Sequence, residues 1–101
     1  MSQATIVVEG SFREGYEAHF AEYSGLVRAY LEKNQGTVVR RQLVKKTLYG
    51  SHNPDLIMVV DFPSEELAEG LFFAQEYLDI IPLRNRIFAD FRMYLARYGE
   101  I

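Results

Sequence analysis

The segment that most restricts the fold of this chain is Leu56–Phe62, which reads LIMVVDF. Its apolar and β-branched residues are typical of a strand, and Asp61 is its one charged residue. A strand that is apolar on both faces must be covered on both sides, because neither face can be left to water. The rest of the chain has to supply that cover.

The N-terminal part of the chain predicts a strand followed by a helix. Residues 4–9 form a short segment rich in β-branched residues, and strand alternation places Ile6 and Val8 on one face. Ser11 and Glu14 have the spacing of a capping box, which predicts that a helix begins at Ser11. The apolar residues that follow recur at helical spacing and include several tyrosines.

Further along, the pattern predicts two more strands and a second helix. We expect the first helix to end at Gly36 in a left-handed conformation, followed by one long, bent strand over residues 37–49. Ser64 is the expected N-cap of the second helix, which Pro82 either kinks or divides. Residues 89–98 alternate between apolar and polar side chains and read as the last strand.

The elements therefore follow the order β-α-β-β-α-β within a single domain of residues 1–101. This order predicts the α+β class with the ferredoxin-like plan, a four-stranded antiparallel sheet with two helices on one face. The open sheet face then presents apolar side chains from Ile6 or Val7, from Val59, and from Met93 or its neighbours. The simplest cover is a second copy related by a two-fold axis, so we expect a homodimer through the open sheet face.

Charge argues against a role in nucleic-acid binding. Eleven Lys and Arg residues against fourteen Asp and Glu residues give a net charge of −3, whereas proteins that bind nucleic acids carry a basic excess. The one basic cluster falls in a strand-like stretch, where alternation sends side chains to both faces. We interpret it as a solvated surface rather than as an anion or RNA groove; its members are Arg40, Arg41, Lys45 and Lys46.

Composition also limits the cofactors and the location that we expect. The chain contains no cysteine, which excludes disulfides and thiolate chemistry. His19 and His52 are far apart in sequence, so no metal site and no cofactor is expected, although haem is not ruled out. The longest apolar run, residues 56–60, is far shorter than a membrane span, and the N-terminus lacks a signal-peptide pattern. We expect a cytoplasmic protein without a membrane partner.

Three groups of residues resemble the landmarks of a known family. They are residues 61–64 (DFPS), 75–77 (QEY) and 81–86 (IPLRNR), and they resemble a small, mostly bacterial family of domains of unknown function in the dimeric α+β barrel superfamily. The resemblance implies two ferredoxin-like subunits with their sheets packed face to face, and a pocket between sheet and helices in each. Members of that superfamily include cofactor-independent monooxygenases, lactone isomerases, polyketide cyclases, haem-degrading enzymes and regulatory domains, so the resemblance implies no particular reaction.

The first candidate site lies on the first predicted helix. His19 and Tyr23 are four residues apart, so their side chains adjoin on a helix, and Tyr16 continues the same broad face. Beside an aromatic pocket, His19 and Tyr23 could serve as base and acid on an enolisable or phenolic substrate. The alternative is that the tyrosines belong to the core and that His19 is an edge residue.

The second candidate site involves charged residues of the C-terminal half. Asp61 interrupts an apolar strand and therefore needs a partner or water. It is a candidate base, with Arg84 as an anchor for a ligand carboxylate and Tyr77 as a further pocket residue. The alternative is an ion pair of Asp61 with Arg84 or Arg86 that has only a structural role.

These residues predict a small-molecule-binding protein of the dimeric α+β barrel type, either a cofactor-free enzyme acting on an aromatic or carbonyl compound or a non-catalytic dimerisation or ligand-sensing domain. The interior distinguishes the two. A connected cavity that contains His19 or Asp61 favours the enzyme, whereas a filled interior favours the non-catalytic domain.

Overall fold

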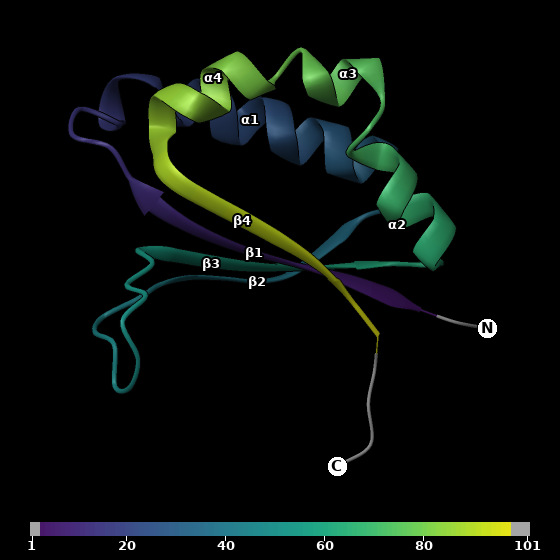
Figure 1. Ribbon diagram of the computed structural model, residues 1–101. Coiled ribbons are helices and arrows are strands. Elements are labelled where there is room, and N and C mark those ends of the chain that lie inside the picture. Colours follow the sequence, from purple (N-terminus) through teal and green to yellow (C-terminus); the bar gives the residue numbers. More distant parts are fainter. Residues whose placement is uncertain (1–2, 98–101) are drawn as a thin grey trace.

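The computed structural model describes residues 3–97 and shows one sheet with all of its helices on the same side (Figure 1). Its elements along the chain are β1 (Ala4–Phe12), α1 (Glu17–Lys33), β2 (Thr37–Leu43), β3 (Leu56–Phe62), α2 (Glu65–Leu71), α3 (Gln75–Leu78), α4 (Ile81–Ile87) and β4 (Phe88–Ala96). Of the expected last strand, Tyr98 lies outside the described residues.

The four strands are ordered β2-β3-β1-β4, and every neighbouring pair is antiparallel. Strand β3 lies between β1 and β2, and β1 lies between β3 and β4, so each β-α-β unit is split by a strand of the other. The predicted ferredoxin-like α+β class is confirmed. The long helix α1 connects β1 to β2, and three short helices, α2 to α4, form the second connection, from β3 to β4.

Alternation along the strands separates two faces of the sheet. Ala4, Ile6 and Val8 are buried beneath the helices, as predicted for Ile6 and Val8. They pair with buried residues of β3, including Val60 and Phe62, which face the same way. The core therefore lies between the helix layer and this face of the sheet.

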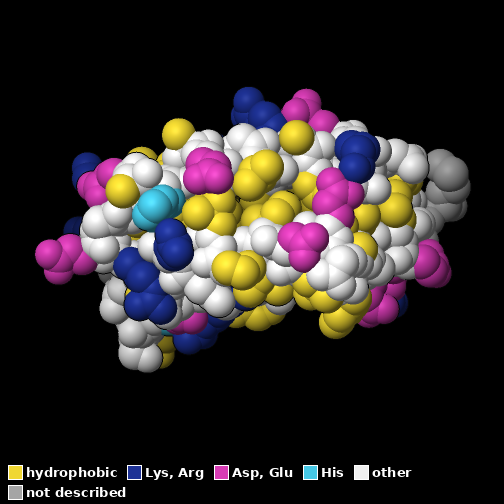
Figure 2. All heavy atoms as spheres, turned by 90° about the horizontal axis from the view of Figure 1, so that it is seen from above, with side chains coloured by type: hydrophobic (Ala, Val, Ile, Leu, Met, Phe, Trp, Pro, Cys, Tyr) yellow, Lys and Arg dark blue, Asp and Glu magenta, His cyan; other side chains and the backbone are white. Residues whose placement is uncertain are grey.

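The opposite side of the sheet, which we call the open face, carries Thr5, Val7 and Glu9 of β1. In the register they stand opposite Asp61, Val59 and Ile57 of β3, and opposite Ala96, Tyr94 and Arg92 of β4. Among residues 3–97 no helix lies on this side (Figure 1). The outer surface of the helix layer also carries hydrophobic patches between charged side chains (Figure 2). Leu26 of α1, Leu78 of α3 and Phe73, between α2 and α3, are among the exposed large hydrophobic residues.

The prediction that α1 begins at Ser11 is wrong. Ser11 is still part of β1, where it pairs with Asp90 of β4, and α1 begins only at Glu17. The Ser11 hydroxyl donates to the carbonyl of Asn53 at 3.3 Å, so it serves the strand end and not the helix. Pairing with β4 extends β1 beyond the point at which local capping signals would have ended it.

The role predicted for Gly36 is also wrong in its detail. Gln35 takes the left-handed conformation, with φ of 68°. The amide of Gly36 donates to the carbonyl of Leu31 at 2.8 Å and so closes the end of α1. A Cβ atom at Gly36 would lie only 2.9 Å from the ring of Phe62. Close packing therefore requires glycine here, and backbone conformation does not.

The long strand expected over residues 37–49 is shorter in the structure. β2 ends at Leu43, and its register against β3 shifts between Val38 and Arg40. Residues 44–55 form a loop whose ends are joined by a hydrogen bond from the amide of Val44 to the carbonyl of Asp55 at 2.8 Å, and the amide of Asp55 donates to the carbonyl of Gly10 in β1 at 2.8 Å. β2 is an edge strand, and most of its side chains are exposed.

Candidate functional site

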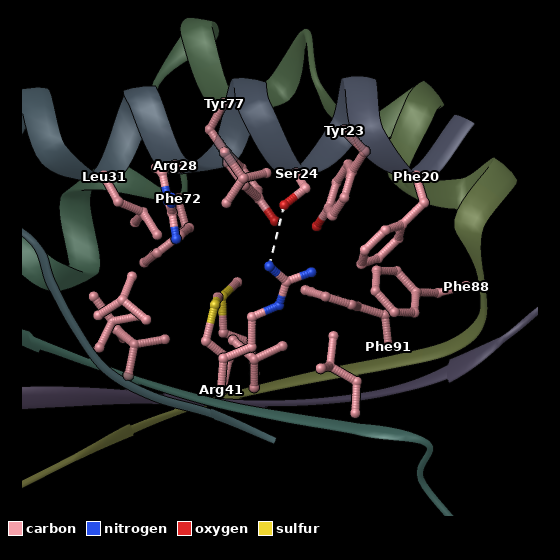
Figure 3. Close-up of a pocket in the computed structure, with 18 residues that line it drawn as sticks. Phe20, Tyr23, Ser24, Arg28, Leu31, Arg41, Phe72, Tyr77, Phe88 and Phe91 are labelled. Atoms are coloured by element: carbon pink, nitrogen blue, oxygen red, sulfur yellow. Dashed lines mark hydrogen bonds between the residues drawn. The ribbon is translucent and has the colours of Figure 1, made fainter. Parts of the chain in front are cut away.

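A cavity lies between α1 and the helix-facing side of the sheet (Figure 3). The volume open to the centre of a water molecule is about 60 Å³, several times the roughly 10–15 Å³ that one water requires. We call it the α1 cavity. Its walls come from α1, all four strands and the second connection: Ile6, Val8, Phe20, Tyr23, Ser24, Val27, Arg28, Leu31, Val38, Arg41, Leu56, Met58, Val60, Phe72, Tyr77, Phe88, Phe91 and Met93.

The α1 cavity is mostly apolar but has a small set of polar side chains. Two are tyrosines, one is a serine and two are arginines: Tyr23, Tyr77, Ser24, Arg28 and Arg41. None of its described lining residues is Asp, Glu or His. Apolar walls with a few converging polar groups are typical of small-molecule sites in proteins.

Tyr23 and Tyr77 point their hydroxyl groups from the helix layer into the cavity (Figure 3). Both side chains are buried. The Tyr77 hydroxyl accepts a hydrogen bond from Nη1 of Arg84 at 3.0 Å. Burial, reinforced by the nearby Tyr77, raises the pKa of the Tyr23 phenol well above its usual value, although Arg84 opposes the shift. Tyr23 therefore stays neutral and keeps its proton as a hydrogen-bond donor.

Arg41 spans the gap between the edge strand β2 and helix α1 (Figure 3). Its Nη1 donates to Oγ of Ser24 at 3.3 Å, and its guanidinium lies 5.1 Å from the centroid of the Phe20 ring. Arg41 is exposed, whereas Ser24 and Phe20 are half-buried. A bond of this length to a neutral hydroxyl is weak, and the cation–π contact adds only modest stability at an exposed site. Arg41 is thus held at the cavity wall only by weak interactions.

A second hollow adjoins the α1 cavity and shares Phe20, Arg41 and Leu56 with it. Tyr16 lies there, its ring stacked on that of Phe12 with centroids 4.0 Å apart. Movement of Arg41 and Phe20 would connect the two hollows.

The structure separates the six site residues predicted from sequence. Tyr23 and Tyr77 line the α1 cavity, and Tyr16 lines the adjoining hollow. Arg84 does not line the α1 cavity but donates a hydrogen bond to the Tyr77 hydroxyl. His19 is half-buried on α1 but lines neither hollow. The structure therefore does not bring His19 and Tyr23 together at the cavity.

Asp61 lies on the open face, where it accepts a hydrogen bond from the Thr5 hydroxyl at 2.9 Å. Arg84 lies in the helix layer, with its guanidinium 4.6 Å from the centroid of the Phe91 ring. The sheet separates the two residues, so the ion pair considered between Asp61 and Arg84 is not formed.

Sequence analysis missed Ser24, Arg28 and Arg41 as cavity residues. Ser24 and Arg28 occur at helical spacing with Phe20 and Leu31, which was a usable signal. Arg41 was assigned to a solvated surface because the shift between Val38 and Arg40 is invisible in the sequence. Val38, before the shift, and Arg41 and Leu43, after it, all stand opposite residues that face the helices.

Neither a metal centre nor a membrane segment is found in the described part of the chain. His52 lies 3.5 Å from Oε1 of Glu9 and 3.7 Å from Oδ2 of Asp90, but residues 3–97 contain no group of three side chains able to hold a metal ion. None of the helices within those residues has both the length and the hydropathy needed to cross a bilayer.

Comparison with known proteins gives one family and a set of similar folds. Residues 6–97 match the family described as Domain of unknown function (DUF1330). A protein of unknown function from Rhodopseudomonas palustris is 14% identical, with a TM-score of 0.83, over 99% of this chain and 85% of that one. No curated protein matches the sequence.

Two further solved structures are less similar. A dimeric protein of unknown function and ferredoxin-like fold from Bacteroides fragilis is 6% identical, with a TM-score of 0.64, over 95% of this chain and 96% of that one. A NIPSNAP family protein of unknown function from Agrobacterium tumefaciens is 12% identical, with a TM-score of 0.61, over 97% and 88% of the two chains. At such identities the similarity establishes the fold alone.

Proposed function

The chain belongs to the DUF1330 family of domains of unknown function, and we propose that it is a small-molecule-binding protein that holds an aromatic or carbonyl compound in the α1 cavity. The observation that carries this proposal is the cavity itself, which lies beneath α1 beside a continuous cluster of buried hydrophobic residues. Protein interiors rarely keep such a space unless it is used.

The walls of the α1 cavity match the proposed ligand class. Aromatic side chains, among them Phe20, Phe72 and Phe91, offer ring faces and edges to an aromatic ligand. The neutral Tyr23 hydroxyl points into the cavity, and within residues 3–97 no protein group forms a hydrogen bond with it. It is therefore suited to donate a hydrogen bond to a carbonyl oxygen of the ligand.

Binding, rather than acid–base catalysis, is the activity that these walls support. A general base works best with a pKa near neutral pH. His19 and Asp61 were the candidates for that role, and neither lines the α1 cavity. The groups that do line it are arginines, a serine and tyrosines, and burial moves the pKa of Tyr23 further from neutrality.

The size of the cavity defines the probe for a test. Its 60 Å³ is less than the roughly 150 Å³ cavity that admits benzene in another protein. A single ring therefore enters only with movement of Arg41 and Phe20 at the boundary with the second hollow. We expect acetophenone, a neutral aromatic carbonyl compound, to shift the amide NMR signals of Ser24, Val27 and Arg41 in a saturable titration.

Two neighbouring positions on α1 provide the variant and its control. Val27 lines the cavity, so Val27→Trp should fill it and abolish the titration. Leu26 is 46% exposed and does not line it, so Leu26→Trp should bind acetophenone like the unaltered protein. Thermal melting shows whether each variant is folded. Signals that shift elsewhere, or a folded Val27→Trp that still binds, would contradict the proposal.

We also infer that the protein is a homodimer that pairs through the open face. Val7 and Val59 stand side by side at the centre of that face, next to Ile57 and Tyr94. Tyr94 is 46% exposed, and apolar side chains gathered in this way are typical of protein interfaces. The similar protein from Bacteroides fragilis is described as dimeric, which supports a dimer but does not identify the face that pairs.

The loop of residues 44–55 supports the same inference. It projects beyond the sheet on the side away from the helices (Figure 1). Leu48 and Tyr49 near its tip are 88% and 98% exposed. A second sheet on the open face would lie beside this loop and could cover both side chains.

A further inference from the structure

We propose that the α1 cavity selects an anionic ligand, a carboxylate carried on an aromatic ring, and that Arg41 is the residue that binds the carboxylate. This inference rests on the proposed function, because it names the chemical class of the ligand for the same cavity. It moves the anion-binding role from Arg84, the residue singled out in the sequence, to Arg41.

The two charged residues that line the α1 cavity are both positive, whereas the adjoining hollow includes Glu17. Arg28 and Arg41 line it, and none of its described lining residues is acidic. The whole chain carries a net charge of −3, so this local excess of positive charge runs against the overall balance. Positive side chains beside low-dielectric walls raise the local concentration of anions.

Three cations on the surface are paired with carboxylates, whereas Arg41 is one of several arginines and lysines in the described part of the chain that are not, and it is set apart from most of these by lining the cavity. Lys33 lies 2.8 Å from Glu76, Arg97 lies 3.1 Å from Glu65, and Arg92 lies 3.2 Å from Asp90. Within residues 3–97, neither Arg28 nor Arg41 has a carboxylate oxygen within ion-pair distance. Among the same described residues, the polar and cation–π contacts of Arg41 are with the neutral hydroxyl of Ser24 and the face of the Phe20 ring.

Arg41 is also placed so that it can change partners. The guanidinium stands at the boundary of the cavity, between β2 and α1 (Figure 3). Exchange of the 3.3 Å bond to Ser24 for two shorter, charge-assisted bonds to a carboxylate would favour the bound state. The ligand ring would then extend into the apolar part of the cavity, near Val27 and Met58.

Arg84 is less suited to this role. Its Nη1 already donates to the Tyr77 hydroxyl at 3.0 Å, its guanidinium lies over Phe91, and its side chain does not line the cavity. Nε of Arg84 is enclosed and has no hydrogen-bond partner in the described part of the chain. We assign Arg84 to positioning Tyr77, which does line the cavity.

A pair of nearly isosteric compounds tests the inference. Benzoate carries the carboxylate, and benzamide replaces it with a neutral amide of similar shape. At neutral pH we expect benzoate to bind at least about tenfold more tightly, because hydrogen bonds between charged partners are stronger than those between neutral ones. Titration of the amide NMR signals of Ser24, Val27 and Arg41 gives both the affinity and the place of binding.

Substitutions then assign the preference to Arg41. Arg41→Gln should lose most of the tenfold preference while leaving benzamide binding nearly unchanged. Arg41→Lys should keep part of it, since lysine retains the charge but not the two-pronged geometry. Arg86→Gln is the matched control, because Arg86 is exposed on α4 and lines neither hollow. It removes one positive charge and should leave both affinities as they are.

Each outcome separates the two proposals. Equal binding of benzoate and benzamide in the cavity overturns the anionic preference and leaves the proposed function standing. A preference for benzoate that survives Arg41→Gln overturns the role of Arg41. If neither benzoate, benzamide nor acetophenone shifts the signals of the cavity residues, the proposed function fails and this inference fails with it.

Discussion

Two buried tyrosines in the α1 cavity have different surroundings. Tyr77 accepts a hydrogen bond from Arg84, while the Tyr23 hydroxyl has no protein partner within residues 3–97. The pKa of Tyr23 is raised chiefly because burial disfavours its charged form. Because the unfolded chain has a tyrosine pKa of about 10, the folded protein holds the proton more tightly than the unfolded chain does.

This difference predicts how stability depends on pH. The raised pKa of Tyr23 contributes to the free energy of unfolding. This contribution is fully present below pH about 10 and is lost as the pH rises above that value, because Tyr23 then releases its proton in the unfolded chain before it does so in the folded protein. We expect the free energy of unfolding, measured with urea, to fall less steeply at alkaline pH in Tyr23→Phe than in the unaltered protein. Tyr49 is 98% exposed, so Tyr49→Phe is the control and should leave the slope unchanged. Identical slopes for both variants would show that Tyr23 is not held neutral by burial.

Whether the orientation of a single side chain could be predicted from the sequence depends on whether its helix or strand is regular. Tyr23 lies on a regular helix, so its inward position follows from spacing alone. Arg41 follows a register shift, and a bulge changes which side chains face the core without leaving a clear mark in composition. Gly36 looked like a left-handed residue, but its role is set by the ring of Phe62, which is distant in sequence.

At the scale of elements, local capping signals gave mixed results. Ser64 was predicted to cap the second helix, and its Oγ accepts a hydrogen bond from the amide of Leu67 at 3.2 Å. Ser11 was predicted to cap the first helix, yet it lies in β1. The difference arises because β1 gains additional pairing with β4, and tertiary pairing outweighs a local signal of about 1 kcal/mol.

The two serines therefore make a matched pair for mutagenesis. Ser64→Ala should lower the free energy of unfolding by about 1 kcal/mol, because the first turn of α2 loses its side-chain cap. Ser11→Ala should change it by less than about 0.5 kcal/mol, since its hydroxyl makes only an exposed bond. Urea denaturation followed by circular dichroism measures both. Equal losses in the two variants would contradict the assignment of the caps.

The second connection shows what proline does to a helical pattern. Pro82 was expected to kink or divide the second helix, and the structure divides it. Pro82 lies in the first turn of α4, where its missing amide hydrogen costs no helical hydrogen bond. The hydrogen bond from Arg84 in α4 to the hydroxyl of Tyr77 in α3 joins the two short helices on either side of the break.

At the scale of the whole molecule, the order of the elements was enough to predict the ferredoxin-like class. A split β-α-β pair places both helical connections on one side of the sheet. The class alone does not establish a function, and the ligand depends on a few cavity side chains that come from separate elements. We propose that the two faces of the sheet serve different partners: a small molecule beneath α1, and a second copy on the open face.

Analytical ultracentrifugation tests this division most directly, with one variant for each face. At micromolar concentration the unaltered protein and Val27→Trp should sediment at twice the chain mass of 11.7 kDa. Val59→Lys should sediment as a monomer that still binds acetophenone, because packing two sheets face to face would remove the charged lysine at the centre of the open face from water. A monomeric unaltered protein, or a Val59→Lys variant that remains a dimer, would contradict the assignment of the open face to a second copy.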